Sequence, residues 1–207
     1  LYVQGYFSYD SKKSGGSTVS HLRFGPTPIK SSYLVYHADY IACHNKSFVY
    51  NFDLLKGIKE NGTFVLNCPW MGQELDDHLP ASLKRTVARK NIRFYTIDAI
   101  KIAGEIGLGN RINMIMQAAF FKLANVIAVE DAVKYLKEAV EHSYGKKGEK
   151  IVRMNNAAID RGISDIKKIE IPADWANAKD DPGVKADVSE FIEEILIPMT
   201  RQEGDDL

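Results

Sequence analysis

The chain has 207 residues, of which 45% are hydrophobic and 26% are charged, and its 27 basic side chains equal its 27 acidic ones. This length allows one sizeable core, and the composition is that of a soluble globular protein. A chain without net charge exerts no global field on nucleic acid or on an anionic membrane, so neither is an expected partner. Only two cysteines occur, outside any C-x-x-C pair, which predicts buried thiols in a reducing cytoplasm rather than a disulfide scaffold.

Neither a membrane segment nor a signal peptide is expected from the sequence. No apolar run approaches the ~18 residues that span a bilayer, so no membrane segment is expected. The first ten residues, LYVQGYFSYD, lack the basic and apolar regions of a signal peptide. They begin directly in strand-like sequence without a methionine, which predicts an excised fragment of something larger.

A hairpin is predicted at the N-terminus. Residues 2–10 and 17–24 are rich in aromatic and β-branched types, which favour strands. The intervening SKKSGG forms the loop, in which Gly15 and Gly16 supply positive φ. Gly25-Pro26 closes the second strand, since proline removes a ladder donor.

From residue 32 onward, short apolar strands alternate with helices. Strands are predicted at 32–37, 40–44, 63–68 and 92–97, and helices at 47–60, 74–90 (interrupted at Pro80), 99–107, 113–124, 130–144 and 149–162. Gly107, Gly145 and Gly162 are predicted to end their helices. The pattern predicts an α/β fold, a mixed sheet flanked by helices in a Rossmann-like three-layer arrangement, with an N-terminal antiparallel hairpin.

Two regions are predicted along the chain. Residues 1–169 form the α/β domain, with the helix at 113–124 inside it because that helix is apolar almost all round. Residues 170–207 are rich in Asp, Ala, Pro and Gly at first, and end in a short amphipathic element and a polar tail. They are interpreted as a surface excursion and a linker to a neighbouring domain.

The hairpin loop is the strongest candidate for chemistry. Phosphate binding needs close backbone approach, free N–H groups, hydroxyl donors and a cation. All of these occur within seven positions, in Lys12, Lys13, Gly15, Gly16, Ser17 and Thr18. The loop matches neither nucleotide-binding glycine motif and does not lead from a strand into a helix. The alternative is a solvated turn with incidental lysines.

Three further positions are open to two interpretations each. His21 and Arg23 share one strand face, which either points at a cofactor or another domain, or is simply exposed. NCPW at 67–70 follows an apolar strand, so Asn67 and Cys68 lie where α/β sheets bind ligands, or Pro69 ends the strand and Trp70 packs.

The third position is the connection GLGNRINM at 107–114. It could place Asn110, Arg111 and Asn113 at a helix N-terminus, where an anion is favoured. The alternative is a cap whose arginine binds neighbouring backbone. No nucleophile signature, catalytic carboxylate pair or metal motif appears, so no catalytic or metal-binding residue is assigned. If the parent protein is an enzyme, this domain supports a site completed elsewhere.

A family resemblance adds to these observations. YFSYDSKKSGGSTVSHLRFGPTPI, YLVYHADYIACHN, GTFVLNCPW and NMIMQAAFFKL closely resemble the pyruvate:ferredoxin (flavodoxin) oxidoreductases over nearly the whole chain. These enzymes convert pyruvate and coenzyme A to acetyl-CoA, CO2 and reduced ferredoxin or flavodoxin. The matching part is the central domain, equivalent to the γ subunit of multi-subunit 2-oxoacid oxidoreductases.

The resemblance implies a division of labour. Thiamine diphosphate with Mg2+ and the [4Fe-4S] clusters are held by other domains, in agreement with the lack of a C-x-x-C-x-x-C run. The γ-like domain is associated with binding coenzyme A and with covering the thiamine site. Candidates for coenzyme A contact are then the loop residues, with Asn67, Arg111 and Asn113 as further ones.

The resemblance also implies partners and a rival function. The partners are other domains of the same enzyme, ferredoxin or flavodoxin, and other copies in a homo-oligomer. The fragment alone is expected to be inactive. The family has a glycine-rich strand–loop–helix of the S-D-G-T-V-G-A-N-K type just upstream, which this sequence does not include and which contributes to the cofactor site and to the first strand of the sheet. The rival hypothesis is a structural interdomain packing module without direct ligand contact.

Overall fold

The computed structural model describes residues 1–9, 16–180 and 189–201. These form two compact units, Leu1–Ala38 (unit 1) and Asp39–Leu207 (unit 2). Unit 1 is built on two antiparallel strands, β1 (Tyr2–Tyr9) and β2 (Thr18–Gly25), paired along their whole length. The predicted N-terminal hairpin is therefore confirmed.

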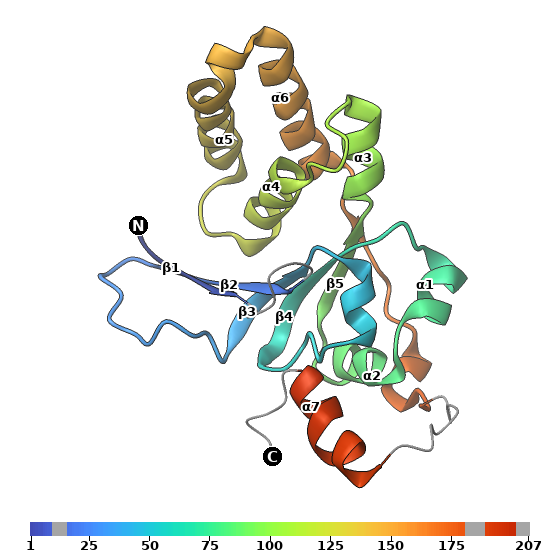
Figure 1. Cartoon of the computed structure of the whole chain (residues 1–207). Coiled ribbons are helices and arrows are strands. Elements are labelled where there is room, and N and C mark those ends of the chain that lie inside the picture. The colour runs from blue at the N-terminus through green and yellow to red at the C-terminus, as the bar shows by residue number, and fades with distance from the viewer. Residues whose placement is uncertain (10–15, 181–188, 202–207) are drawn as a thin grey trace. The chain divides into compact units, whose positions relative to one another are not determined.

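Unit 2 contains a four-stranded sheet with helices on its faces (Figure 1). The strands are β3 (Ala38–Cys43), β4 (Ile58–Asn67), β5 (Arg93–Ile97) and β6 (Lys167–Lys168). The α-helices are α1 (Gly72–His78), α2 (Ala81–Arg89), α3 (Ala99–Ile106), α4 (Asn113–Ala124), α5 (Val129–Tyr144), α6 (Glu149–Ser164) and α7 (Ile197–Thr200). Short helical turns are η1 (Lys46–Tyr50), η2 (Gly145–Lys147), η3 (Ala173–Asn177) and the π-helical η4 (Ile192–Leu196).

The sheet is mixed, with strand order β3-β4-β5-β6. β4 and β5 are parallel, and β5 and β6 are antiparallel. Contacts at both ends indicate that β3 also runs parallel to β4. Near the start of each strand Lys59 pairs with Asp39 at 2.7 Å, and at the other end the Asn67 Nδ2 donates to the His44 carbonyl at 2.9 Å. The predicted mixed sheet is confirmed.

Side chains along the central strands alternate between the two faces of the sheet, so helices pack on both sides of it and form three layers. Phe64 and Phe94 stack with ring centroids 5.2 Å apart and belong to a core cluster that includes α1, α2 and η3. Their neighbours Val65 and Ile97 point to the other face and pack with α3, α4 and α6. In Figure 1, α4, α5 and α6 lie together on this second side of the sheet. Successive side chains of β4 and β5 thus pack on opposite faces, and both faces are buried, as expected of strands inside a three-layer fold.

Helix α4 lies between the sheet and α5–α6, which explains its apolar circumference. Ile115 and Met116 belong to the cluster on the sheet, whereas Ala118 belongs to the cluster with α5 and α6. All three side chains are buried, so the predicted position of this helix inside the molecule is confirmed. The break at Pro80 is also confirmed, because this proline separates α1 from α2.

The helix predicted over 47–60 is wrong. Only η1 is helical there, and the chain then turns at Asp53, whose Oδ1 accepts from the Leu55 N–H at 3.2 Å. Gly57 adopts φ +79°, after which β4 begins at Ile58. Of the apolar residues at helical spacing, Leu55 and Ile58 are buried and Phe48 and Phe52 are partly buried, within a compact turn and the start of a longer strand.

The strand predicted over 32–37 is absent, since β3 is the first strand after β2 within the described residues. Its backbone groups are instead bound by side chains of β2. The Arg23 guanidinium donates to the carbonyls of Ser32, Tyr33 and Leu34, which are the groups that a ladder would use. Side-chain hydrogen bonds therefore replace strand pairing here.

Gly107 and Gly145 end α3 and α5 as predicted, although Gly145 lacks the left-handed conformation of a glycine cap, and the helix end predicted at Gly162 is wrong. Gly107 ends α3 with φ +93°, as predicted. Gly145 has helical φ of −52° and continues into η2, and Gly148 with φ +102° is the residue that reverses the chain before α6. Gly162 lies inside α6, where a Cβ would sit 2.4 Å from the Ile115 carbonyl oxygen of α4. It is required by close helix packing rather than by capping.

Residues 170–180, which the sequence assigns to the surface excursion, contribute to the core of unit 2. Trp175 of η3 is buried with 3% exposure and packs 6.3 Å from the Phe94 ring. Its indole Nε1 donates to the Asp76 carboxylate at 2.6 Å. The segment that follows β6 therefore packs against α1 and α2.

Candidate functional site

The hairpin tip carries the predicted phosphate loop. Tyr9 pairs with Thr18 as the last pair of β1 and β2, so residues 10–17 connect the strands there. Lys12, Lys13 and Gly15 lie outside the described residues. Gly16 and Thr18 are exposed and Ser17 is half-buried. The described part of the loop thus presents a glycine backbone and a threonine hydroxyl to solvent, which are groups that bind an anionic oxygen.

Arg23 and His21 organise unit 1 from inside. The Arg23 Nη1 donates to the Gln4 Oε1 at 2.9 Å, and its Nη2 donates to the Leu34 carbonyl at 2.6 Å. The His21 Nδ1 accepts from the Val35 N–H at 3.1 Å, so this nitrogen must be unprotonated. The two side chains share a face as predicted and bind the segment that follows their own strand, so they are not simply exposed; contact of this face with a cofactor or another domain stays a prediction.

The electrostatics of His21 agree with this role. Partial burial and the neighbouring Arg23 charge lower the pKa of His21 below its usual value. The neutral imidazole is therefore favoured, which is the form that accepts the Val35 N–H.

Asn67 ties together the carboxyl ends of two parallel strands. Its Nδ2 donates to the His44 carbonyl after β3, and its Oδ1 accepts from the Ala99 N–H at the start of α3, each at 2.9 Å. The side chain is 2% exposed. Both ends of the amide are thus used inside the protein, and its contact with a cofactor stays a prediction.

The two cysteines lie at the same edge of the sheet. Cys43 ends β3 and Cys68 follows β4, and both side chains are buried in one core cluster. Burial raises the pKa of each thiol to about 11. Near neutral pH both stay protonated, which removes the thiolate that nucleophilic or metal chemistry needs. The predicted burial of these thiols is confirmed.

Trp70 is part of a stack beside this edge. It lies 4.3 Å from the His78 ring at an interplanar angle of 16°, and the Lys46 ammonium lies 5.1 Å from the centre of its ring. The His78 Nδ1 is 3.1 Å from the Tyr50 hydroxyl. With an exposure of 4%, Trp70 packs as the second interpretation of NCPW requires.

The connection between α3 and α4 contains the remaining predicted residues. Gly107 and Gly109 adopt φ of +93° and +62°. Arg111 and Asn113 are exposed, and Asn113 is the first residue of α4, whose N-terminus lacks a side-chain cap. The structure brings these two residues together, but not with Asn67: the eight residues of α3 span about 12 Å from its start to this connection.

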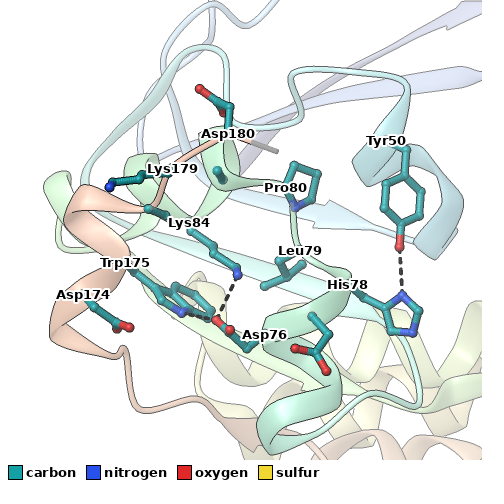
Figure 2. Close-up of a pocket in the computed structure, with 13 residues that line it drawn as sticks. Tyr50, Asp76, His78, Leu79, Pro80, Lys84, Asp174, Trp175, Lys179 and Asp180 are labelled. Carbon is teal, nitrogen blue, oxygen red and sulfur yellow. Dashed lines mark hydrogen bonds and ion pairs between the residues drawn. The ribbon is translucent and has the colours of Figure 1, made fainter. Parts of the chain in front are cut away.

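A pocket of about 580 Å3 opens between α1, α2 and η3 (Figure 2). Within it, Asp76 accepts from the Trp175 indole and pairs with the Lys84 ammonium at 3.0 Å. The hydrogen bond from Lys84, together with that from Trp175, lowers the pKa of Asp76. Arg85 beside the pocket pairs with Asp180 at 3.0 Å.

Sequence reasoning assigned these carboxylates no role, and no local motif marks them. Asp76 binds Trp175, and Asp180 binds Arg85, across about a hundred positions of the chain, so only the fold shows these two pairings. These charged groups hold η3 and the residues after it onto α1 and α2. The pocket therefore lies where these parts of the fold pack against one another. Across the described ranges, no three His, Cys, Asp or Glu side chains are grouped as a metal site would need.

Among the helices described, none is both long and apolar enough to cross a bilayer.

The family model for pyruvate ferredoxin/flavodoxin oxidoreductase matches residues 1–164. The chain belongs to this family. The resemblance inferred from the sequence motifs is therefore confirmed, and so is membership of a family of oxidoreductases.

Curated relatives match the whole chain but are much longer. Pyruvate:ferredoxin oxidoreductase of Moorella thermoacetica is 55% identical over 208 residues, which cover 100% of this chain and 18% of the relative. The mitochondrial pyruvate dehydrogenase [NADP(+)] of Euglena gracilis is 48% identical over 209 residues, covering 100% of this chain and 12% of that protein. The chain therefore spans less than a fifth of the length of these relatives.

A solved structure shares the fold. The pyruvate oxidoreductase subunit PORC from Thermotoga maritima superposes with a TM-score of 0.63 and covers 82% of each chain, at 16% sequence identity. At this identity the likeness concerns architecture. It agrees with the prediction that the domain has the fold of a separate subunit in related enzymes.

Proposed function

We propose that this domain helps to bind coenzyme A in an enzyme that oxidatively decarboxylates pyruvate to acetyl-CoA and CO2 and reduces ferredoxin or flavodoxin. The contact is made by the hairpin tip, through Lys12, Lys13, Gly15, Gly16, Ser17 and Thr18. The domain also covers the thiamine diphosphate site of the parent. Family membership supports the reaction class, and the chemistry of the loop supports the ligand.

The observation that carries this proposal is the register of the hairpin. Because Tyr9 pairs with Thr18, two lysines, two glycines and two hydroxyl residues are gathered at or next to one strand connection. Coenzyme A offers a 3′-phosphate and a pyrophosphate, which need cations together with N–H and O–H donors. Arg111 and Asn113, exposed at the start of α4, are further candidates.

The rest of the reaction belongs elsewhere in the parent. Two cysteines are too few for the four thiolates of a [4Fe-4S] cluster, so electron transfer through clusters takes place in other domains, as does binding of thiamine diphosphate with Mg2+. The relatives are named for ferredoxin and for NADP+ yet match the whole chain at similar identity. This supports a role in the pyruvate chemistry that their names share, rather than in the choice of acceptor.

Calorimetric titration of coenzyme A into the full-length parent enzyme tests the proposal. Replacing both lysines, Lys12→Ala with Lys13→Ala, should weaken binding by roughly 10- to 100-fold, since a charge-assisted contact contributes about 1.5 kcal/mol. The matched control is Lys146→Ala with Lys150→Ala, which removes two exposed charges near α5 and α6. The control should bind coenzyme A as the parent does.

Dephospho-coenzyme A separates the two phosphate groups. If the lysines bind the 3′-phosphate, the double variant should no longer distinguish coenzyme A from its dephospho form. If they bind the pyrophosphate, both ligands should weaken equally. Unchanged affinity for both would contradict the proposal and favour the structural packing module. Arg111→Ala, tested in the same way, should give a smaller loss.

A further inference from the structure

The two faces of the unit 1 hairpin differ in what covers them. Side chains alternate along antiparallel strands, so the register assigns each residue to a face. One face carries Gln4, Tyr6, His21 and Arg23, and residues 31–35 lie against this part of it. There Tyr6 lies 5.5 Å from the Tyr33 ring, and Arg23 and His21 bind the backbone.

The opposite face, called the outer face, holds Val3, Phe7, Tyr9 and Leu22. These side chains are 58%, 52%, 73% and 46% exposed. The Phe7 and Tyr9 rings lie 6.5 Å apart. Leu22 extends over Gly5 in the facing strand, where a Cβ would sit 3.3 Å from the Leu22 Cδ2. The result is a continuous apolar surface.

The composition of this face is not that of a solvated surface. Its remaining positions are Gly5, Thr18, Ser20 and Phe24, so no charged side chain occurs on it. An exposed apolar sheet face without a charge is typical of a binding surface, and aromatic residues are enriched at interface cores. A two-stranded hairpin is marginal in water until its apolar face is packed.

The occupant follows from the length of the relatives. More than four fifths of the Moorella thermoacetica enzyme lies outside the region that this chain matches. We infer that the outer face docks against an apolar surface of the parent polypeptide that lies outside these 207 residues. The absence of charge on the face disfavours a nucleic acid or a charged lipid surface as the occupant. This inference does not depend on the coenzyme A contact at the hairpin tip.

Photo-cross-linking in the full-length parent enzyme tests the inference. p-Benzoyl-phenylalanine is placed at Phe7 in one variant and at Tyr9 in a second, so that a fold disturbed by one label is checked by the other. The same label at Tyr135, an aromatic residue of α5 with 57% exposure, gives the background. After irradiation, cross-linked peptides are identified by mass spectrometry.

The expected result is a cross-link from Phe7 or Tyr9 to a peptide outside residues 1–207 of the parent, at a yield well above that of the Tyr135 variant. A cross-link within residues 39–207 would mean that unit 2 covers the face, and one to residues 1–38 of a second copy would mean self-association. Either outcome overturns the inference. A yield at both positions no higher than the Tyr135 background overturns it as well.

Discussion

Unit 1 and unit 2 are stabilised by different interactions. Unit 2 buries both faces of its central strands, and Phe64, Val65 and Phe94 have no exposed surface. In unit 1 no described residue is buried. Its irregular segment is held by hydrogen bonds that Arg23 donates and His21 accepts, rather than by a hydrophobic core. The same sequence thus contains a domain with its own core and a hairpin whose apolar side chains remain available to a partner.

This difference fits a domain that works inside a larger enzyme. In unit 2, buried strands and packed helices form a core. Each Å2 of apolar surface that this core removes from water stabilises the fold by about 25 cal/mol. A hairpin without such burial gains most of that free energy only when its outer face is packed.

Removing Trp175 should destabilise unit 2 most. Trp175→Ala leaves a cavity beside Phe94 and removes one of the two hydrogen-bond partners of Asp76, so the free energy of unfolding should fall by about 3–5 kcal/mol in urea titration. The control Tyr135→Ala, at an exposed ring of α5, should change it by less than about 0.5 kcal/mol. A loss as small as that of the control would show that η3 is not part of the core.

Glycine-to-alanine changes in two helices should have opposite signs. Gly162→Ala places a Cβ 2.4 Å from the Ile115 oxygen and should lower the free energy of unfolding by about 1–3 kcal/mol. Gly104→Ala in α3 meets no atom within 4 Å and should raise it by about 0.5–1 kcal/mol through helix propensity. Equal effects of the two substitutions in thermal denaturation would contradict the close α4–α6 packing.

Gly107 and Gly162 illustrate what the sequence could not provide. Glycine after an amphipathic run predicts a cap, and at Gly107 that is correct. At Gly162 the same pattern reflects a contact with α4, some 40 positions earlier, which no local signal records. Long-range packing therefore decides between two meanings of one residue type.

The strands and helices of unit 2 were mostly predictable, because buried strands and amphipathic helices have distinct periods. The exception, residues 47–60, has helical spacing of apolar residues, yet Asp53 and Gly57 form turns between them. At the candidate site, the position of Asn67 at a strand end was predictable. That its amide is used for Ala99 and His44 was not, since both partners are more than 20 positions away.

The smallest expected effect concerns the hydrogen bond to His21 in unit 1. The pKa of His21 is lowered in the folded state, so its contribution to stability is complete above its ordinary pKa of about 6.5 and is lost as the pH falls through the folded value. Acidification from pH 7 should therefore speed hydrogen exchange at the Val35 amide beyond the intrinsic change. His21→Gln should remove this pH dependence. If the ratio of the observed to the intrinsic exchange rate at Val35 stays constant with pH in the unsubstituted chain, the hydrogen bond from the Val35 N–H to His21 does not hold this segment.

Amide hydrogen exchange on the 207-residue chain and on its full-length parent tests the contrast between the two units most directly. In the isolated chain, amides of β4 and β5 should exchange slowly, whereas those of β1 and β2 should exchange close to their intrinsic rates. In the parent, β1 and β2 should become protected while β4 and β5 change little. Protection of β1 and β2 equal to that of β4 and β5 in the isolated chain would contradict the account.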